Sequence, residues 1–317
     1  MAVLPERQMG ARTGFQPEGR LAQFWKRVKQ NKVSYLFVAP YGLLFFLFTV
    51  LPVGVAVVLS FTDYNMLQPP QWVGWKNYLR LFLADDVFLI AVKNTFVFAV
   101  ITGPVSYLAS FVFAWLINDL RPKIRAVLTL LLYAPSIAGS LYLIWTIIFS
   151  GDAYGLINSL LLYLGIIKDP IQFLTDPKWM MGVVIIVVLW MSLGTSFLAF
   201  IAGLQGIDSS LYEAAAVDGI RNRWQELFFI TLPQMRGYLM FGAIMAITNS
   251  FAAAEQIIPL VGFPSTDYAG HTIVAHLVDY GSVRFEMGMA SSIAVILFFA
   301  MVTVQRVVQR LLNMIGT

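Results

Sequence analysis

The chain has 317 residues, of which 59% are hydrophobic and only 12% are charged, and its formal net charge is +4. A soluble globular protein holds about 25% charged residues, so this composition excludes a water-soluble globule and predicts a membrane protein. The absence of Cys excludes disulfides, thiol catalysis and thiolate metal sites.

Residues 1–32 form a polar, basic tail in front of the first apolar stretch. That stretch is much longer than the core of a secretory signal, which has about 7–15 residues, and it lacks a small-residue cleavage site. We therefore expect an uncleaved membrane anchor behind a cytoplasmic tail.

Six apolar stretches are long enough to span a bilayer, because about 20 helical residues cross its ~30 Å hydrocarbon core. Lipid offers no hydrogen-bond partner to open backbone, so each span must be helical. The predicted spans are 34–62, 88–118, 124–150, 179–206, 236–260 and 287–310, within one all-α, polytopic domain, 33–317.

Six spans place both termini on the same side of the membrane. That side carries 15 of the 21 Lys and Arg residues, so the positive-inside rule identifies it as the cytoplasm. The net positive charge is then an insertion signal, and we expect no nucleic-acid partner.

Two connections on the outer side are long. Residues 63–87 are rich in Pro, Gly and aromatic side chains, which forbids a spanning helix there. The second connection, 152–178, contains an uncharged run at 153–167 that is too short to cross comfortably. We expect an interfacial or re-entrant helix at 153–167 rather than an extra span.

The inner connection at 208–233, called the 208–233 loop below, is a polar island between the fourth and fifth spans. Asp208 and Ser210 can each cap a helix start, and Ser210 with Glu213 has the spacing of a capping box. Gly219 stands where a left-handed C-terminal cap would fall. A short helix is therefore predicted between these caps.

A second short helix is predicted after it. Asn222 can cap its start. Pro233 can close it and open the next span.

These residues resemble the EAA loop, the signature cytoplasmic loop of bacterial ABC importer permeases. The run Glu213-Ala214-Ala215, then Asp218-Gly219, Ile230 and Leu232-Pro233, carries the resemblance, and Trp224-Gln225 is similar to carbohydrate permeases of the maltose and glycerol-phosphate type. Between Gly219 and Ile230 the loop is one residue longer than the pattern. Its second half is therefore expected to be rotated or to contain a bulge.

The resemblance implies a type I ABC importer (MetI-like) fold whose EAA coupling helices dock on a separate ATPase. Glu213 would pair with a basic group of that ATPase, although it could also simply cap its own helix. The implied ATPase-coupling residues are Glu213, Ala214, Ala215, Asp218, Gly219, Leu232 and Pro233.

The same resemblance implies several partners. These are a second homologous permease, with a heterodimer favoured, two cytoplasmic ABC ATPase subunits, and an extracytoplasmic solute-binding protein received by the segments 63–87 and 263–284. The chain has no Gly-x-x-x-x-Gly-Lys loop to bind a nucleotide phosphate. We expect no enzyme activity and no cofactor on this chain, with ATP and Mg bound by the ATPases.

Polar residues within the spans are expected to line the pathway, because lipid-facing positions disfavour them. A sugar would be recognised by hydroxyls, amides, carboxylates and aromatic rings, and the candidate residues are Trp190, Ser192, Thr195, Asn249, Ser250 and Glu255. Each has an alternative interpretation: Ser and Thr often bond their own backbone, and Trp often anchors at the interface.

Other functions remain open. His271 and His276 are five residues apart and lack further ligands, which favours surface or packing roles over a metal site. An ion-coupled secondary transporter typically shows internal repeats and several intramembrane charges, and neither is evident here. The expected function is a permease subunit in the bacterial cytoplasmic membrane, forming half of the pathway for a sugar or oligosaccharide; an ABC permease for a non-sugar solute is a further alternative.

Overall fold

The structure, a computed structural model, describes residues 29–252 and 254–315. The predicted tail, 1–32, lies almost wholly outside these residues. The chain divides into two compact units, Met1–Val55 and Ala56–Thr317. The described part of the first unit is helical: α2 (Lys32–Phe45) is followed by a π-helical turn (Phe46–Val50), and α3 (Leu51–Leu59) crosses the boundary.

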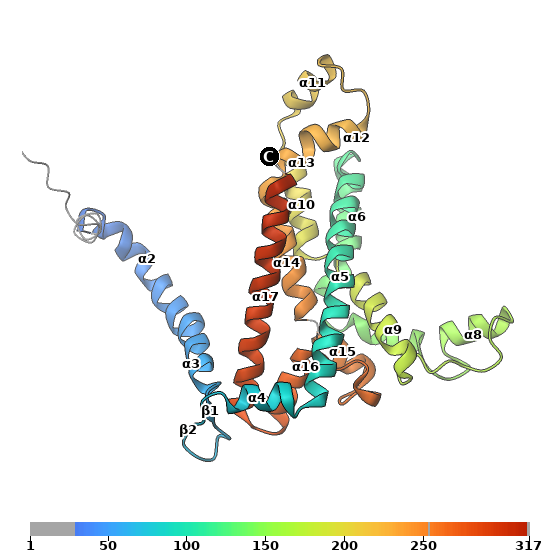
Figure 1. Ribbon diagram of the computed structural model, residues 1–317. Helices are drawn as coiled ribbons and strands as arrows, with labels where there is room; N and C mark the ends of the chain where they lie inside the picture. Colours follow the sequence, from blue (N-terminus) through green and yellow to red (C-terminus); the bar gives the residue numbers. More distant parts are fainter. Residues whose placement is uncertain (1–28, 253, 316–317) are drawn as a thin grey trace, which may run out of the picture. The chain divides into compact units, whose positions relative to one another are not determined.

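The second unit is dominated by long helices (Figure 1). They are α5 (Asp86–Asn118), α6 (Pro122–Ile137), α9 (Pro177–Trp190), α10 (Thr195–Gln205), α14 (Arg236–Phe251) and α17 (Met287–Ile315). Among the described residues, four helical stretches have the length and apolar character of a span, or six if two bent pairs each count as one. The predicted all-α polytopic membrane fold is confirmed.

The third predicted span, 124–150, is not straight. It consists of α6, a 3-10 turn (Leu141–Leu143) and α7 (Ile144–Ile148), with a bend of 82° between the two parts. Pro135 in the last turn of α6 lacks an N–H group, and Gly139 at the break has no preference for helix. Their combination explains why an apolar stretch of sufficient length bends.

The fourth and fifth predicted spans are interrupted. Residues 191–194 leave the helix between α9 and α10, where Gly194 adopts φ −103° and ψ −134°. The fifth span continues from α14 into α15 (Ala254–Val261). Backbone outside a helix at membrane depth must be buried in protein or line a cavity. The two breaks therefore mark where a cavity is expected.

Helices α10 and α14 lie close together because glycine stands at their contact. A Cβ atom on Gly242 would lie 2.2 Å from the Phe200 ring, and one on Gly203 would lie 2.7 Å from the Tyr238 ring. The Ser196 hydroxyl donates to the carbonyl of Gly242 across the same contact, at 3.2 Å. Small residues of this kind let membrane helices pack without a hydrophobic driving force between them.

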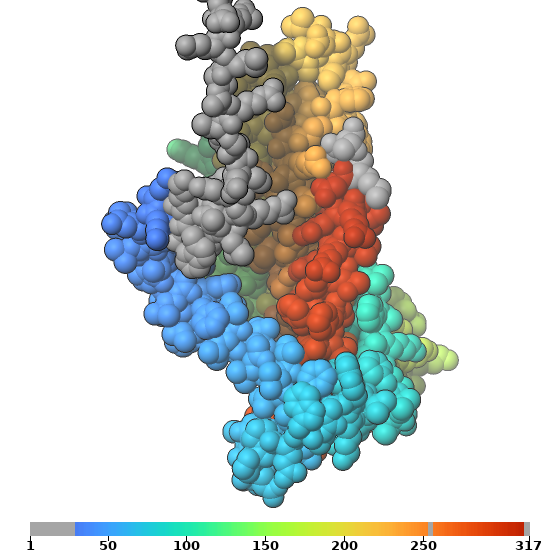
Figure 2. Space-filling view, turned by 60° about the vertical axis from the view of Figure 1, so that its left-hand side comes forward, coloured from blue at the N-terminus to red at the C-terminus, as the bar shows by residue number. Residues whose placement is uncertain are grey.

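Residues 63–87 form a compact cap at one end of the bundle. Strands β1 (Thr62–Asp63) and β2 (Gln71–Trp72) pair antiparallel, and α4 (Lys76–Leu83) follows. The buried Asn77 amide donates to the carbonyls of Ser60 and Thr62, at 3.0 and 2.9 Å. Figure 2 shows the hairpin and α4 as one continuous surface below the start of α17, which both of them contact.

The uncharged run at 153–167 contains α8 (Leu156–Tyr163), a helix of only 8 residues. At about 1.5 Å per residue it is roughly 12 Å long, far short of a span. Its buried Asn158 amide donates to the carbonyls of Ser150 and Ile171, at 2.9 and 3.0 Å. An extra span is therefore excluded. Whether α8 is an interfacial or a re-entrant helix stays a prediction.

The segment between α15 and α17 carries a 3-10 turn (Thr266–Tyr268), α16 (Ile273–Val278) and a π-helical turn (Asp279–Val283). His271 and His276 are both buried there, with their Nε2 and Nδ1 atoms 3.1 Å apart. His276 Nε2 lies 3.1 Å from Asp85 Oδ2, which also accepts a hydrogen bond from the Tyr280 hydroxyl at 2.9 Å. The histidines thus have a packing role and tie this segment to the start of α5.

Candidate functional site

The 208–233 loop begins with α11 (Ser209–Val217), which Asp208 caps. The carboxylate of Asp208 accepts a hydrogen bond from the Ser210 N–H at 3.0 Å, which lowers the pKa of Asp208. The predicted capping box of Ser210 and Glu213 is wrong, because Ser210 lies inside the helix. A carboxylate one residue before the first turn interacts better with the positive end of the helix than a hydroxyl does.

Gly219 ends α11 as predicted. Its φ of +97° is a left-handed conformation that L side chains rarely adopt. The Ile220 N–H donates to the carbonyl of Ala215 at 3.0 Å, and the Gly219 N–H donates to that of Ala216 at 3.4 Å. This is the Schellman pattern, which satisfies the last carbonyls of the helix.

The second half of the loop contains a bulge, which is one of the two alternatives that its extra residue left open. Asn222 caps α12 (Arg223–Glu226) by accepting from the Gln225 N–H at 2.8 Å. A π-helical turn (Leu227–Thr231) follows, and the chain then continues as α13 (Leu232–Gln234). A π turn holds one residue more than an α turn. The extra residue of this loop is therefore accommodated without unfolding the helix.

Most of the predicted coupling residues face solvent. Glu213, Ala214, Asp218, Gly219 and Pro233 are exposed, Leu232 is half-buried and Ala215 is buried. The exposed face of α11 is free of the bundle, and it has the small residues that close approach by another protein requires.

Contacts with the end of α5 hold the loop to the rest of the second unit, and a hydrogen bond joins the two halves of the loop. Arg223 forms an ion pair with Asp119, next to the end of α5, and its guanidinium carbon lies 4.9 Å from the centre of the Trp115 ring. Tyr212 and Thr231 share a hydrogen bond of 2.9 Å between their hydroxyls, which joins α11 to the π turn. The loop is thus linked directly to α5.

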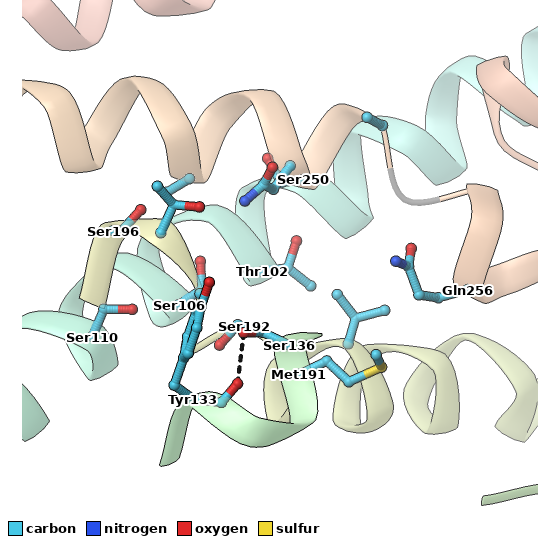
Figure 3. A pocket seen from close by; sticks show the side chains of 16 residues that line it. Thr102, Ser106, Ser110, Tyr133, Ser136, Met191, Ser192, Ser196, Ser250 and Gln256 are labelled. Atoms are coloured by element: carbon cyan, nitrogen blue, oxygen red, sulfur yellow. Dashed lines mark hydrogen bonds between the residues drawn. The ribbon is translucent and has the colours of Figure 1, made fainter. Parts of the chain in front are cut away.

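A cavity of about 340 Å³ lies inside the bundle, where the fourth and fifth predicted spans are broken (Figure 3). Its size falls within the usual range for small-molecule sites. It is lined by Thr102, Ser106, Ser110, Tyr133, Ser136, Val188, Met191, Ser192, Gly194, Thr195, Ser196, Ala246, Asn249, Ser250, Ala252 and Gln256. Because hydroxyl groups dominate this lining, we call it the hydroxyl-lined cavity. None of these described lining residues is charged.

Four of the predicted pathway residues line this cavity: Ser192, Thr195, Asn249 and Ser250. Trp190 instead ends α9 and packs against Trp145, with the ring centres 5.4 Å apart. Glu255 belongs to α15, and its side chain lies outside the described residues.

The second span contributes three wall residues that sequence reasoning missed. Thr102, Ser106 and Ser110 all lie on α5 at intervals of four residues, which places them on one face of the helix. That repeat within an apolar span was the available signal. Taken singly, each of these Ser and Thr residues cannot be distinguished in the sequence from one whose hydroxyl bonds its own backbone.

Comparisons with known proteins agree on one class. Residues 106–314 match the family described as binding-protein-dependent transport system inner membrane component. The chain is 32% identical over 270 residues to the probable ABC transporter permease protein YesP of Bacillus subtilis, covering 84% of this chain and 85% of that protein. It is 30% identical over 227 residues to the lactose transport system permease protein LacF of Rhizobium radiobacter. This match covers 71% of this chain and 74% of that protein.

The fold has solved counterparts. A chain of a bacterial ABC transporter that imports the acidic polysaccharide alginate matches with a TM-score of 0.74 and 22% identity, covering 93% of this chain and 100% of that one. The same kind of transporter, in complex with an alginate pentasaccharide-bound periplasmic protein, matches with a TM-score of 0.74 and 21% identity. At this identity the likeness establishes the fold alone.

Proposed function

Because this chain belongs to the family of inner membrane components of binding-protein-dependent transport systems, we propose that it forms half of the pathway of an ATP-driven importer for a sugar or oligosaccharide. The hydroxyl-lined cavity is the observation that carries this proposal. Neutral polar side chains inside a membrane bundle are stable only where they meet protein, water or a polar solute. Named relatives carry lactose and arabinooligosaccharides, which agrees with such a lining.

The energy for transport is proposed to enter through α11. Its Glu213 and Ala214 are exposed, and the loop that carries them is bonded to α5, which forms one wall of the cavity. Two ATPase subunits that bind ATP and Mg would dock there, with the coupling residues Glu213, Ala214, Ala215, Asp218, Gly219, Leu232 and Pro233 at the contact. Both termini would then lie in the cytoplasm of a bacterium.

The opposite end of the bundle is proposed to receive a solute-binding protein. The segments 63–87 and 263–284 lie together there: Arg80 forms a 2.9 Å ion pair with Glu286, just past the second segment, and its guanidinium stacks on the Tyr280 ring at 5.7 Å. One shared surface made from both segments suits a single partner better than two separate loops would.

Co-purification and reconstitution test the proposal. The tagged chain is expected to bring down two ABC ATPase subunits and a second permease of similar size, as a heterodimer. Proteoliposomes with that complex and its binding protein are expected to accumulate a labelled sugar only with ATP inside the compartment that the ATPases face. Uptake by this chain alone, driven by an ion gradient, would favour a secondary transporter instead.

A further inference from the structure

The hydroxyl-lined cavity holds many hydroxyl groups whose protons are already engaged. Thr102 donates to the carbonyl of Phe98 at 2.8 Å, Ser136 to that of Tyr133 at 2.8 Å, and Ser192 to that of Leu189 at 2.7 Å. The same holds for Ser106, Ser196 and Ser250, whose hydroxyls donate to backbone carbonyls at 3.0, 3.2 and 2.9 Å. A hydroxyl group has one proton but two acceptor lone pairs. These six groups therefore offer only acceptors to a solute.

The remaining polar side chains of the lining keep a proton to donate: the hydroxyls of Ser110, Tyr133 and Thr195 and the amides of Asn249 and Gln256. Ser110 is 1% exposed, and its hydroxyl has no hydrogen-bond partner among the described residues. Asn249 and Gln256 contribute amide groups to the lining. A buried hydroxyl without a partner is unfavourable unless water or a solute supplies one. Ser110 therefore marks a position where a bound molecule gains a hydrogen bond.

We propose that this cavity is selective for uncharged, polyhydroxylated solutes and disfavours sugars that carry a carboxylate. This inference rests on the proposed function and specifies its substrate class. A sugar hydroxyl donates its proton to an acceptor wall and can accept from Ser110 or an amide. A carboxylate only accepts, so it needs several donors or a cation to replace the water that it loses. The described lining provides no cation, and all of its donors are neutral hydroxyl or amide groups.

Matched ligands test the selectivity. The assembled complex in lipid nanodiscs is titrated with methyl glucoside and methyl glucuronoside, which differ only in whether C6 belongs to a hydroxymethyl or to a carboxylate group, and with the corresponding galactose pair. The neutral member of each pair is expected to bind at least tenfold more tightly. Equal or tighter binding of the uronoside would overturn the inference, and so would failure of both members to bind.

Two variants locate the effect in the cavity. Ser110→Ala removes the unpartnered hydroxyl and is expected to weaken binding of the neutral glycoside about fivefold or more. Thr303→Ala is the matched control, because Thr303 is exposed on α17, bonds its own backbone at Phe299 and does not line the cavity. Equal effects of the two substitutions would contradict the role of Ser110.

The outcomes separate this inference from the proposed function. If ATP-driven sugar uptake is intact but uronosides bind as well as neutral glycosides, only the selectivity fails. If neutral glycosides are preferred but uptake does not depend on ATP, only the proposed function fails.

Discussion

Residue 219 shows how a single backbone conformation can matter to coupling. At its φ of +97° an alanine would be strained by about 1 kcal/mol, because its Cβ crowds the neighbouring carbonyl. We predict that Gly219→Ala loosens the end of α11 and lowers the amount of sugar taken up per ATP hydrolysed, while membrane insertion stays normal. The measurement is the ratio of uptake to ATP hydrolysis in proteoliposomes.

Gly237→Ala is the matched control for that substitution. Gly237 lies in α14 with no positive φ and with open space where a Cβ would stand. An unchanged uptake ratio in Gly219→Ala, or an equal loss in both variants, would contradict the role of the C-terminal cap of α11.

His271 makes the opposite end of the bundle sensitive to acid. It lies outside the predicted spans, and burial together with the neighbouring His276 lowers its pKa to about 4. An unfolded histidine has a pKa of about 6.5, so below that pH the unfolded chain binds a proton that the folded chain refuses. Stability is therefore fully present above pH 6.5 and falls as the pH drops from about 6.5 to about 4.

We predict that wild-type protein loses more thermal stability than His271→Gln between pH 7.5 and pH 5, measured as the shift in Tm in detergent. Glutamine keeps an amide N–H near the position of Nε2 but cannot take up a proton. Parallel loss of stability in the two proteins would contradict this assignment, since the acid effect would then come from other groups.

Among the elements, the 208–233 loop contacts the end of α5 through one exposed ion pair and through the rings of Trp224 and Trp115, whose centres are 5.3 Å apart. Arg223 and Asp119 are each about half exposed, at 48% and 56% of the side chain, so the pair contributes less than about 1 kcal/mol to stability. We predict that Arg223→Gln leaves Tm nearly unchanged but lowers uptake per ATP. The double substitution Asp119→Arg with Arg223→Asp exchanges the two charges and is expected to restore part of the lost uptake per ATP.

Arg221→Gln provides the comparison for the ion pair, because Arg221 is exposed on the same loop. A loss of coupling in Arg221→Gln as large as in Arg223→Gln would mean that general positive charge, and not the link to Asp119, is what matters.

The contact of α10 with α14 is tested by overpacking. We predict that Gly242→Ala lowers stability by about 1–3 kcal/mol, because the new methyl group would overlap the buried Phe200 ring. Thermal unfolding in detergent measures the effect, and Gly182→Ala, where space is open, is the control. Equal Tm values for Gly242→Ala and Gly182→Ala would contradict the close approach.

The membrane-spanning stretches were predictable from sequence because the length of an apolar run alone decides whether it can cross a bilayer. The caps at Gly219 and Asn222 were predictable because local chemistry determines a helix end. The cavity was not, because its walls come from elements far apart in the chain, and a hydroxyl facing a cavity has the same sequence signature as one facing its own backbone.

For the whole molecule, α5 connects the three features described here. Asp85 caps its start and binds His276, its middle lines the hydroxyl-lined cavity, and its end lies next to Asp119 and the 208–233 loop. A helix of 33 residues is about 50 Å long, enough to cross the membrane. We therefore expect movement of the loop to change the cavity and the opposite end of the bundle together.

The most direct measurement is sugar uptake per ATP hydrolysed by the reconstituted complex carrying Glu213→Ala. Glu213 is exposed on α11, so the substitution should not disturb folding. We predict that uptake falls at least tenfold while the complex still inserts and hydrolyses ATP without transport. Wild-type uptake per ATP in this variant would contradict the central claim that α11 carries the work of ATP hydrolysis into the membrane bundle.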